Sequence, residues 1–224
     1  MHFSEKAQKP VTEDALGYLP CSSVQEFSRH LEIYGPDNPA SGLYLVIDGR
    51  VKLSRLGDGA EVVVDILQAD DFFGESSLLE TPSDAEQATA MEPTKVMTWT
   101  FPEIERLVAK EPRLAIALMQ VVVRRSVGYT RRLESFSVDG TAQRLARSLL
   151  QFAERSGRGE EGGATTIAPL THEVLAHYVG TSREIISHHM SDFRNKGYIR
   201  YSRKGITVQR GSMRAWLQLK TNHV

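Results

Sequence analysis

The side chains best suited to specific chemistry lie between residues 183 and 188. Arg183, Glu184, Ser187 and His188 are polar and recur at helical spacing. Residues three and four positions apart share one face of a helix. Arginine can bind guanine through two hydrogen bonds, glutamate can accept one from the cytosine amino group, and serine can serve several bases. This face could therefore read base edges in the major groove of DNA.

The surrounding sequence predicts two helices joined by a tight turn. Residues 171–180 predict a short helix with Thr171 as its N-cap and Gly180 at its end, and residues 181–196 predict a second helix that Gly197 stops. Residues 198–209 predict a basic β-hairpin, so the whole segment predicts a winged helix-turn-helix. The second helix is expected to bury a stripe formed by Ile185, Ile186, Met190 and Phe193.

Two simpler interpretations of this segment stay open. Any helical hairpin with a solvated polar face shows the same spacing of polar residues. Glu184 also completes a capping box with Thr181, and it could then serve only as a cap. If Ser182 is the N-cap instead, Glu184 is free to reach a base.

Charge is divided unevenly along the chain. Residues 164–224 contain nine Lys or Arg and three Asp or Glu, a balance of +6. The preceding 163 residues hold 18 basic and 25 acidic side chains, a balance of −7, so the formal net charge of −1 conceals a basic C-terminal part. Phosphate contact requires a local basic surface. The distribution favours nucleic acid as the partner of the C-terminal part and argues against it for the rest.

The composition, with 41% hydrophobic residues, is that of an ordinary globular protein. A chain of 224 residues suits two small domains. No apolar run approaches the roughly 18 residues of a membrane span, and the N-terminus lacks the apolar core of a secretory signal. The one cysteine, Cys21, excludes an intrachain disulfide and fits a reducing compartment. We therefore expect a cytoplasmic protein with no membrane partner.

The sequence offers no motif for catalysis. It contains no nucleophile elbow, phosphate loop or metal-ligand cluster. The protein is therefore expected not to be an enzyme. One alternative from another class stays open, namely a barrel-shaped enzyme or ligand-binding module whose C-terminal part mediates protein interaction.

Residues 28–100 predict a small antiparallel β-domain. Four β-rich runs, at 43–47, 51–54, 62–67 and 96–100, alternate with turns that contain glycine. Closely spaced strands with glycine corners are typical of a jelly roll or small barrel. The expected fold class is therefore α+β, with this β-roll first and the helical unit last. Thr100 and Glu103 form a capping box around Pro102, which predicts that a helix begins there.

A long helix is expected from Pro112 to about Ser135. Six of its residues form a heptad seam with spacings of three and four: Ile116, Met119, Val123, Ser126, Thr130 and Leu133. The seam could pack against the chain's own β-domain or join two copies. Its early apolar content exceeds what one face can bury locally, which favours a two-stranded dimer. Residues 137–140 predict a hinge, and residues 141–155 another amphipathic helix.

A β-roll, long helix, hinge and winged helix-turn-helix in this order resemble the Crp/Fnr family of bacterial transcription regulators. The resemblance covers roughly residues 20–210. It rests on the motifs Gly42-Leu-Tyr-Leu-Val-Ile-Asp-Gly-Arg-Val-Lys-Leu, Phe73-Gly-Glu-Ser-Ser-Leu, Ala142-Gln-Arg-Leu-Ala-Arg-Ser-Leu-Leu and Val179-Gly-Thr-Ser-Arg-Glu-Ile-Ile-Ser. It implies a sensor domain at 1–110, a dimerisation helix with its hinge at 111–138 and a DNA-binding domain at 139–224. The implied partners are a second copy, a palindromic operator, RNA polymerase and a small-molecule effector.

The family's recognition helix uses positions that match Arg183, Glu184, Ser187 and His188. The Glu-x-x-Ser-Arg pattern of Fnr-type members becomes Glu184-x-x-Ser187-His188 here, and histidine cannot make the bidentate guanine contact of arginine. One base position therefore departs from the family pattern. Contacts to DNA phosphates are expected from Thr171, His172, Ser182, Arg203 and Lys204.

The resemblance also places an effector pocket at Gly74, Glu75, Ser76, Glu86 and Gln87. Members that bind cyclic nucleotides follow their Gly-Glu, about ten residues later, with an Arg-Ser that clamps the phosphate, whereas this chain has Ala85-Glu86-Gln87-Ala88 there. A carboxylate in place of the guanidinium would repel a phosphodiester. We therefore expect the β-domain to sense something other than cyclic AMP, or nothing, in which case DNA binding would be constitutive.

Metal and haem cofactors are not expected either. An iron–sulfur cluster needs several cysteines, and Cys21 is alone. No histidine lies between Glu32 and Thr171, so the β-domain and long helix offer no imidazole to a metal ion. Haem would need Cys21, His30, a methionine or the N-terminus as its ligand.

Overall fold

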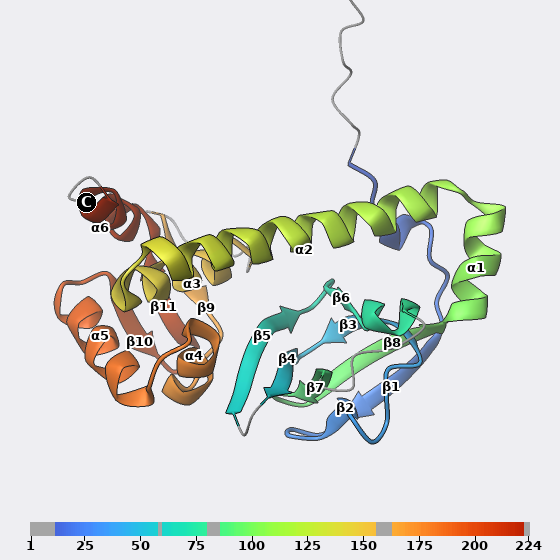
Figure 1. Cartoon of the computed structure of the whole chain (residues 1–224), viewed down its shortest axis with the longest axis horizontal. Helices are drawn as coiled ribbons and strands as arrows, with labels where there is room; N and C mark the ends of the chain where they lie inside the picture. The colour runs from blue at the N-terminus through green and yellow to red at the C-terminus, as the bar shows by residue number, and fades with distance from the viewer. Residues whose placement is uncertain (1–11, 58–59, 80–85, 156–162, 222–224) are drawn as a thin grey trace, which may run out of the picture. The chain divides into compact units, whose positions relative to one another are not determined.

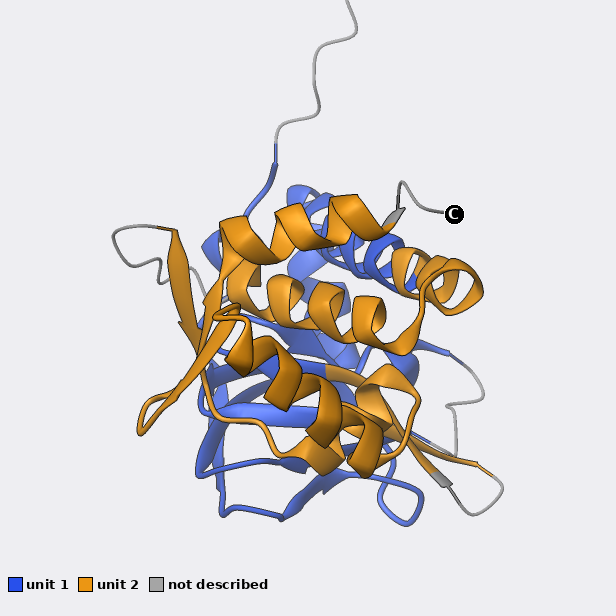
Figure 2. Ribbon diagram, turned by 90° about the vertical axis from the view of Figure 1, so that its left-hand side faces the viewer, with its two compact units in different colours: residues 1–53, 66–129 blue, residues 54–65, 130–224 orange. Residues whose placement is uncertain are grey.

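The chain divides into two compact units. The computed structural model describes residues 12–57, 60–79, 86–155 and 163–221. Unit 1 comprises residues 1–53 and 66–129, and unit 2 comprises residues 54–65 and 130–224 (Figure 2). None of the helices in the described ranges combines the length and apolarity that a bilayer crossing requires.

The β-roll is built from two four-stranded sheets (Figure 1). The first has the order β1-β8-β3-β6, and its neighbouring strands pair antiparallel. The second has the order β2-β7-β4-β5. Their bounds are β1 Ser23–Phe27, β2 Glu32–Tyr34, β3 Gly42–Asp48, β4 Arg50–Gly57, β5 Ala60–Gln68, β6 Phe72–Phe73, β7 Glu86–Ala90 and β8 Thr94–Thr100, with short 3-10 turns η1 at Ala15–Gly17 and η2 at Glu75–Leu78. The four runs expected from the sequence are thus confirmed as β3, β4, β5 and β8.

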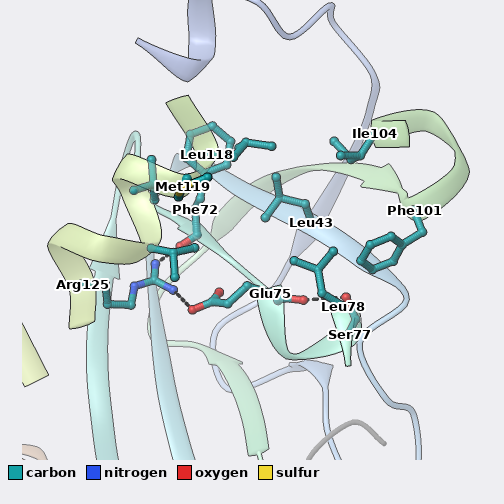
Figure 3. Close-up of a pocket in the computed structure, with 13 residues that line it drawn as sticks. Leu43, Phe72, Glu75, Ser77, Leu78, Phe101, Ile104, Leu118, Met119 and Arg125 are labelled. Atoms are coloured by element: carbon teal, nitrogen blue, oxygen red, sulfur yellow. Dashed lines mark hydrogen bonds and ion pairs between the residues drawn. The ribbon is translucent and has the colours of Figure 1, made fainter. Parts of the chain in front are cut away.

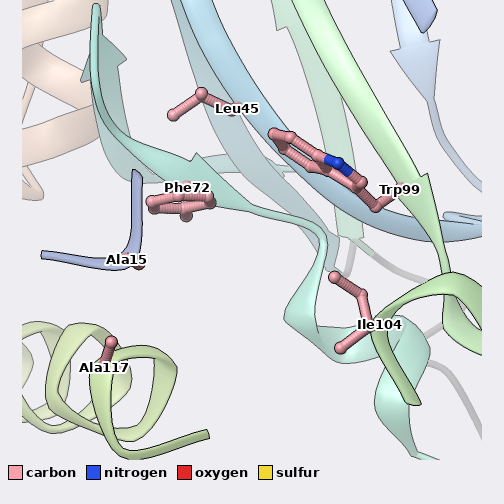
Figure 4. Close-up of a cluster of buried hydrophobic side chains, with 6 residues drawn as sticks. All are labelled: Ala15, Leu45, Phe72, Trp99, Ile104 and Ala117. Carbon is pink, nitrogen blue, oxygen red and sulfur yellow. The ribbon is translucent and has the colours of Figure 1, made fainter. Parts of the chain in front are cut away.

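One cluster of buried side chains fixes the helices of unit 1 against its first sheet (Figure 4). It brings together Ala15, Leu45, Phe72, Trp99, Ile104 and Ala117. The indole N–H of Trp99 donates to the carbonyl of Pro20 at 3.1 Å, so its polar edge is satisfied although the ring is buried. Helix α1, Phe101–Lys110, begins at the expected capping box, in which the backbone N–H of Thr100 donates to Glu103 at 2.7 Å.

Helix α2 runs from Arg113 to Val138, about three residues beyond the end expected from the sequence. The break therefore falls at Asp139 and Gly140, and α3 follows at Thr141–Arg155. Asp139 is nearly buried and forms an ion pair with Arg147 at 2.6 Å. This pair ties the carboxylate to the second turn of α3, which fixes the chain direction after the break.

Unit 2 contains a helix-turn-helix and a small sheet. Its elements are β9 Ala164–Ile167, α4 His172–Val179, α5 Arg183–Asn195, β10 Ile199–Ser202, β11 Gly205–Gln209 and α6 Arg210–Thr221, and the sheet order is β10-β11-β9. Leu145 and Leu149 of α3 are fully buried with Leu175, Ile186 and Met190 of the helix-turn-helix. Helix α6 was not expected from the sequence.

Candidate nucleic-acid interface

The turn between α4 and α5 is fixed by two hydroxyl N-caps and one glycine. Thr171 accepts a hydrogen bond from the backbone N–H of Val174 at 3.2 Å, and Ser182 accepts one from Ile185 at 3.4 Å. Gly180 ends α4 in the left-handed conformation with φ +72°, which favours glycine. The helix-turn-helix expected from the sequence is therefore confirmed, and the N-cap of α5 is Ser182, not Thr181.

One face of α5 is anchored in the core of unit 2. Ile186, Met190 and Phe193 are completely buried, as expected. The fourth residue of the expected stripe is a correction, because Ile185 is 43% exposed. The buried residues follow the spacing i, i+4, i+7, and Ile185 lies about 100° away from Ile186 round the first turn. An apolar side chain thus joins the polar residues on the outer face.

The predicted base-reading residues lie at the start of α5. Arg183, Glu184 and His188 are exposed, and Ser187 is half-buried. The backbone N–H of Glu184 and the hydroxyl of Ser182 both donate to the Glu184 carboxylate, which holds its pKa below the usual range. Glu184 is therefore charged at neutral pH, as acceptance from a cytosine amino group requires.

Ser187 is bound to a histidine of the neighbouring helix. Its Oγ lies 2.8 Å from Nδ1 of His172 and 2.8 Å from the carbonyl oxygen of Arg183. Nε2 of His172 lies 3.2 Å from the hydroxyl of Tyr201 on β10. Burial, followed by the nearby positive charge of Arg183, lowers the pKa of His172. Tyr201 is a site residue that the sequence did not single out.

The wing is the hairpin of β10 and β11, with Arg203 and Lys204 exposed at its tip. Gly205 follows with φ +138°, and a Cβ at this position would lie 1.9 Å from the carbonyl oxygen of Ile167. Only glycine therefore allows β11 to approach β9 so closely. Within the wing β11 pairs with β10, and on its other side it pairs with β9, so the wing presents its cations on a defined loop.

The five residues expected to contact phosphates come from three segments of unit 2. Thr171 and Ser182 are exposed helix caps, and Arg203 and Lys204 are exposed on the wing. His172 is half-buried, with both ring nitrogens engaged as described above. Helix N-termini carry partial positive charge and free backbone N–H groups, which suits anionic oxygens.

The expected effector residues of unit 1 divide into separate contacts. The carboxylate of Glu86 accepts hydrogen bonds from Ser76 and Tyr34, both at 2.8 Å. Gln87 donates to Glu32 at 2.5 Å. Burial and the charge of Glu86 raise the pKa of Tyr34, so its phenol remains a donor. The sequence did not single out Tyr34 or Glu32.

Glu75 has a partner of its own on α2. It forms an ion pair with Arg125 of α2, which also donates to the carbonyl of Phe72. Beside this pair lies a cavity of about 260 Å³, lined mainly by apolar side chains of α1, α2 and η2 (Figure 3). Gly74 begins η2 with φ +84°, and a Cβ there would lie 2.4 Å from the ring of Tyr44. Glycine is therefore required at this turn.

Two family models match the chain. A cyclic nucleotide-binding domain matches residues 24–111, and a Crp-like helix-turn-helix domain matches residues 143–212. Together they take in the β-roll with α1 and the helix-turn-helix with its wing. The chain belongs to the Crp/Fnr family of transcription regulators.

Relatives of this Crp/Fnr member match most of its length. The CRP-like cAMP-activated global transcriptional regulator of Mycobacterium tuberculosis is 29% identical over 184 residues, 82% of each chain. A global nitrogen regulator of Nostoc is 27% identical over 191 residues, 84% of this chain and 85% of the other. The structure of FixK2 from Bradyrhizobium japonicum is similar in fold, with a TM-score of 0.74 at 22% identity over 87% of this chain and 96% of that chain.

The seam of α2 lies between the two matched domains of this Crp/Fnr chain. All six seam residues, Ile116, Met119, Val123, Ser126, Thr130 and Leu133, are exposed. Leu114 and Ala117 of the same helix are completely buried within unit 1. Met119 is both a seam residue and one of the residues that line the cavity of unit 1, so the seam begins at the margin of the face of α2 that meets the β-roll.

Proposed function

We propose that this Crp/Fnr regulator binds DNA sequence-specifically as a homodimer, with one α5 in each half of a palindromic operator. The observation that carries the proposal is the construction of α5. Its inner face is fixed by completely buried side chains, while Arg183, Glu184 and His188 project from its first turns. In a helix-turn-helix, the N-terminal residues of the second helix contact base edges. Arg183 and Glu184 would contact guanine and cytosine, with Ser187 and His188 beside them.

The seam on α2 supports a dimer. Its apolar members are half-exposed or more, from 50% for Ile116 to 69% for Leu133. A second copy of α2 packed along this seam would remove them from water, which is favourable in proportion to the area buried. Two recognition helices related by a two-fold axis then match half-sites about one helical turn apart.

Phosphate contacts would come from Thr171, His172 and Ser182 at the helix starts and from Arg203 and Lys204 on the wing. The five residues lie on α4, α5 and the β10–β11 hairpin, which are elements of one unit. Lysine and arginine supply the affinity for any sequence, and this affinity falls as salt rises. As a transcription regulator, the protein would act in the cytoplasm through contact with RNA polymerase.

The effector proposed for the β-roll is not cyclic AMP. A carboxylate, Glu86, is held by Ser76 and Tyr34 where cyclic-nucleotide-binding members are expected to place a guanidinium. A phosphodiester brought to Ser76 would meet this negative charge. We also propose that the protein holds no iron–sulfur cluster, because Cys21 is its one cysteine, and no haem, because no histidine lies between Glu32 and Thr171.

Selection from a random duplex library with the purified full chain tests DNA binding directly. We expect a palindromic site, bound at least about 1,000-fold more tightly than scrambled duplex. Arg214 provides a matched control, because it is a partly exposed arginine of unit 2 that is paired with Glu154 at 2.6 Å on α3. Arg214→Ala should leave the selected site unchanged. Failure of the wild type to enrich any sequence would refute the proposal.

Calorimetry and gel-shift titration test the effector. Titration of micromolar protein with cyclic AMP should give no heat of binding, and micromolar binding would contradict the role given to Glu86. Titration of the selected duplex with and without candidate metabolites then separates a controlled regulator from a constitutive one. An affinity that no metabolite changes would favour constitutive binding, for which the internally satisfied Glu86 provides a structural reason.

A further inference from the structure

The hydroxyl of Ser187 has only one proton, and its surroundings decide where that proton points. The carbonyl oxygen of Arg183, at 2.8 Å, can only accept a hydrogen bond, so Ser187 donates to it. Nδ1 of His172 lies at the same distance from Oγ. Because the serine proton is already engaged, Nδ1 must carry a proton and donate it to Oγ.

The other side of the imidazole agrees with this assignment. A neutral histidine with its proton on Nδ1 has a lone pair on Nε2. Nε2 faces the hydroxyl of Tyr201 at 3.2 Å, and this hydroxyl can donate. The lowered pKa of His172 favours the neutral ring. The hydrogen bonds therefore run in one direction, from Tyr201 to His172, to Ser187 and to the carbonyl of Arg183.

This direction limits what Ser187 can do at a base. Its proton is committed, one lone pair accepts from His172, and the second lone pair stays available to DNA. In the major groove, adenine N6 and cytosine N4 carry amino donors, whereas guanine N7 and O6, adenine N7 and thymine O4 only accept. We propose that Ser187 reads its base as an acceptor only and selects an exocyclic amino group, and that His172 is the positioning residue that fixes this polarity. The inference rests on the proposed DNA binding.

Base analogues can test the polarity atom by atom. The base position read by Ser187 is the one whose preference Ser187→Ala relaxes in the selection. Two duplexes are then made at that base pair, one in which the adenine or cytosine lacks its amino group, and one in which the purine N7 is replaced by carbon. Loss of the amino group should weaken wild-type binding by about 3- to 10-fold, the size of one neutral hydrogen bond. The same loss should change the affinity of Ser187→Ala by less than about 2-fold. Removing the amino group also weakens the base pair, but this affects both proteins alike and cancels when the two fold-changes are compared.

The N7 replacement is the control duplex. It should affect wild type and Ser187→Ala equally. If instead its effect disappears in Ser187→Ala, Ser187 donates to an acceptor and the inference is wrong. If neither analogue distinguishes the two proteins, Ser187 makes no base contact and the inference is likewise wrong. A wild type that enriches no duplex at all would refute the proposed function itself, so the two failures can be told apart.

Variants of His172 test the positioning role. His172→Asn keeps an N–H near the place of Nδ1 and should retain the amino-group dependence, whereas His172→Leu should lose it. Because His172 is also a proposed phosphate contact, the dependence is taken within each variant as the ratio of its affinities for the two duplexes, in which a general loss of affinity cancels. Retention in His172→Leu would overturn the role. The tautomer can be observed without any variant, from the imidazole ¹⁵N chemical shifts of the full-length wild type. A proton on Nε2 rather than Nδ1 in the free protein would also overturn it.

Discussion

Replacing Met119 by aspartate tests the seam of α2 where it is most apolar. Met119 is 62% exposed and Val123, one turn later, is 54% exposed. Full burial of such a side chain contributes about 1.5–3 kcal/mol, so burying the exposed part of Met119 would contribute about 1–2 kcal/mol. In a symmetric dimer each residue counts twice, which gives about 2–4 kcal/mol for this position alone.

Met119→Asp should remove this contribution and add the cost of bringing two carboxylates together. A loss of about 2 kcal/mol already raises the dissociation constant of a dimer about 30-fold. Sedimentation equilibrium measures this constant directly. The same samples, titrated with a full palindrome and with a single half-site, should show that the variant gains little from the second half-site.

Arg124→Asp is the matched control for this experiment. Arg124 is exposed on the same helix, five residues after Met119, and therefore lies about 140° away from it round the helix. It should leave the dimer dissociation constant within about 3-fold of wild type. If Met119→Asp behaves as Arg124→Asp does, the seam is not the dimer contact, and the exposed apolar residues of α2 have another explanation.

Three further outcomes are expected from the same structure. Arg183→Ala should cost roughly 1–3 kcal/mol on the selected site and relax one base position, whereas Lys204→Ala should weaken all duplexes alike and reduce the salt slope by about 1, as fluorescence titration at several salt concentrations would show. Gly205→Ala should lower the free energy of unfolding in urea by at least about 3 kcal/mol, because alanine is strained at this positive φ and its Cβ would also meet β9. Gly197→Ala, at φ +76° with open space around it, should lower it by only about 1–2 kcal/mol. Burial and the neighbouring His188 lower the pKa of His189, so the folded protein binds fewer protons at this position than the unfolded chain does. The free energy of unfolding should therefore be highest above about pH 6.5, the ordinary pKa of histidine, and should fall as the pH is lowered. In His189→Gln this fall should be smaller.

Much of the helix-turn-helix could be predicted because its signals are local. Thr171, Gly180 and the spacing of Ile186, Met190 and Phe193 depend only on helix geometry and capping chemistry. The assignment of Ile185 was wrong for a related reason. Periodicity indicates which residues can share a face, but in the first turn of a helix it does not tell how far the packing partner extends.

The missed elements had weak or misread patterns. All of β1 except Phe27 is exposed, so no alternation marks it as a strand. Helix α6 does carry a signal, because Met213 and Leu217 are buried four residues apart, and Trp216 packs edge-on against Phe193 at 5.3 Å. A scan for helical spacing beyond the wing would have found it.

The contacts of the effector region could not be predicted from the sequence, because they join residues far apart in the chain. Tyr34 and Glu86 are 52 positions apart, and Arg125 and Glu75 are 50 positions apart. The resemblance to the Crp/Fnr family placed Glu75 and Glu86 in one pocket. The structure gives them different partners, and only the packing of the β-roll and α2 determines this.

The start of α5 shows how capping and base reading can be combined. The hydroxyl oxygen of Ser182 accepts from the backbone N–H of Ile185 at 3.4 Å, and the hydroxyl still has its own proton to donate. A carboxylate has several lone pairs, so Glu184 can accept from a cytosine amino group whichever way that proton points. An aspartate would cap α5 as well as serine does, but it has no proton and would repel a phosphate oxygen. Under the proposed function, serine at this position caps α5 and offers a donor to a phosphate, while Glu184 beside it on the first turn reads a base.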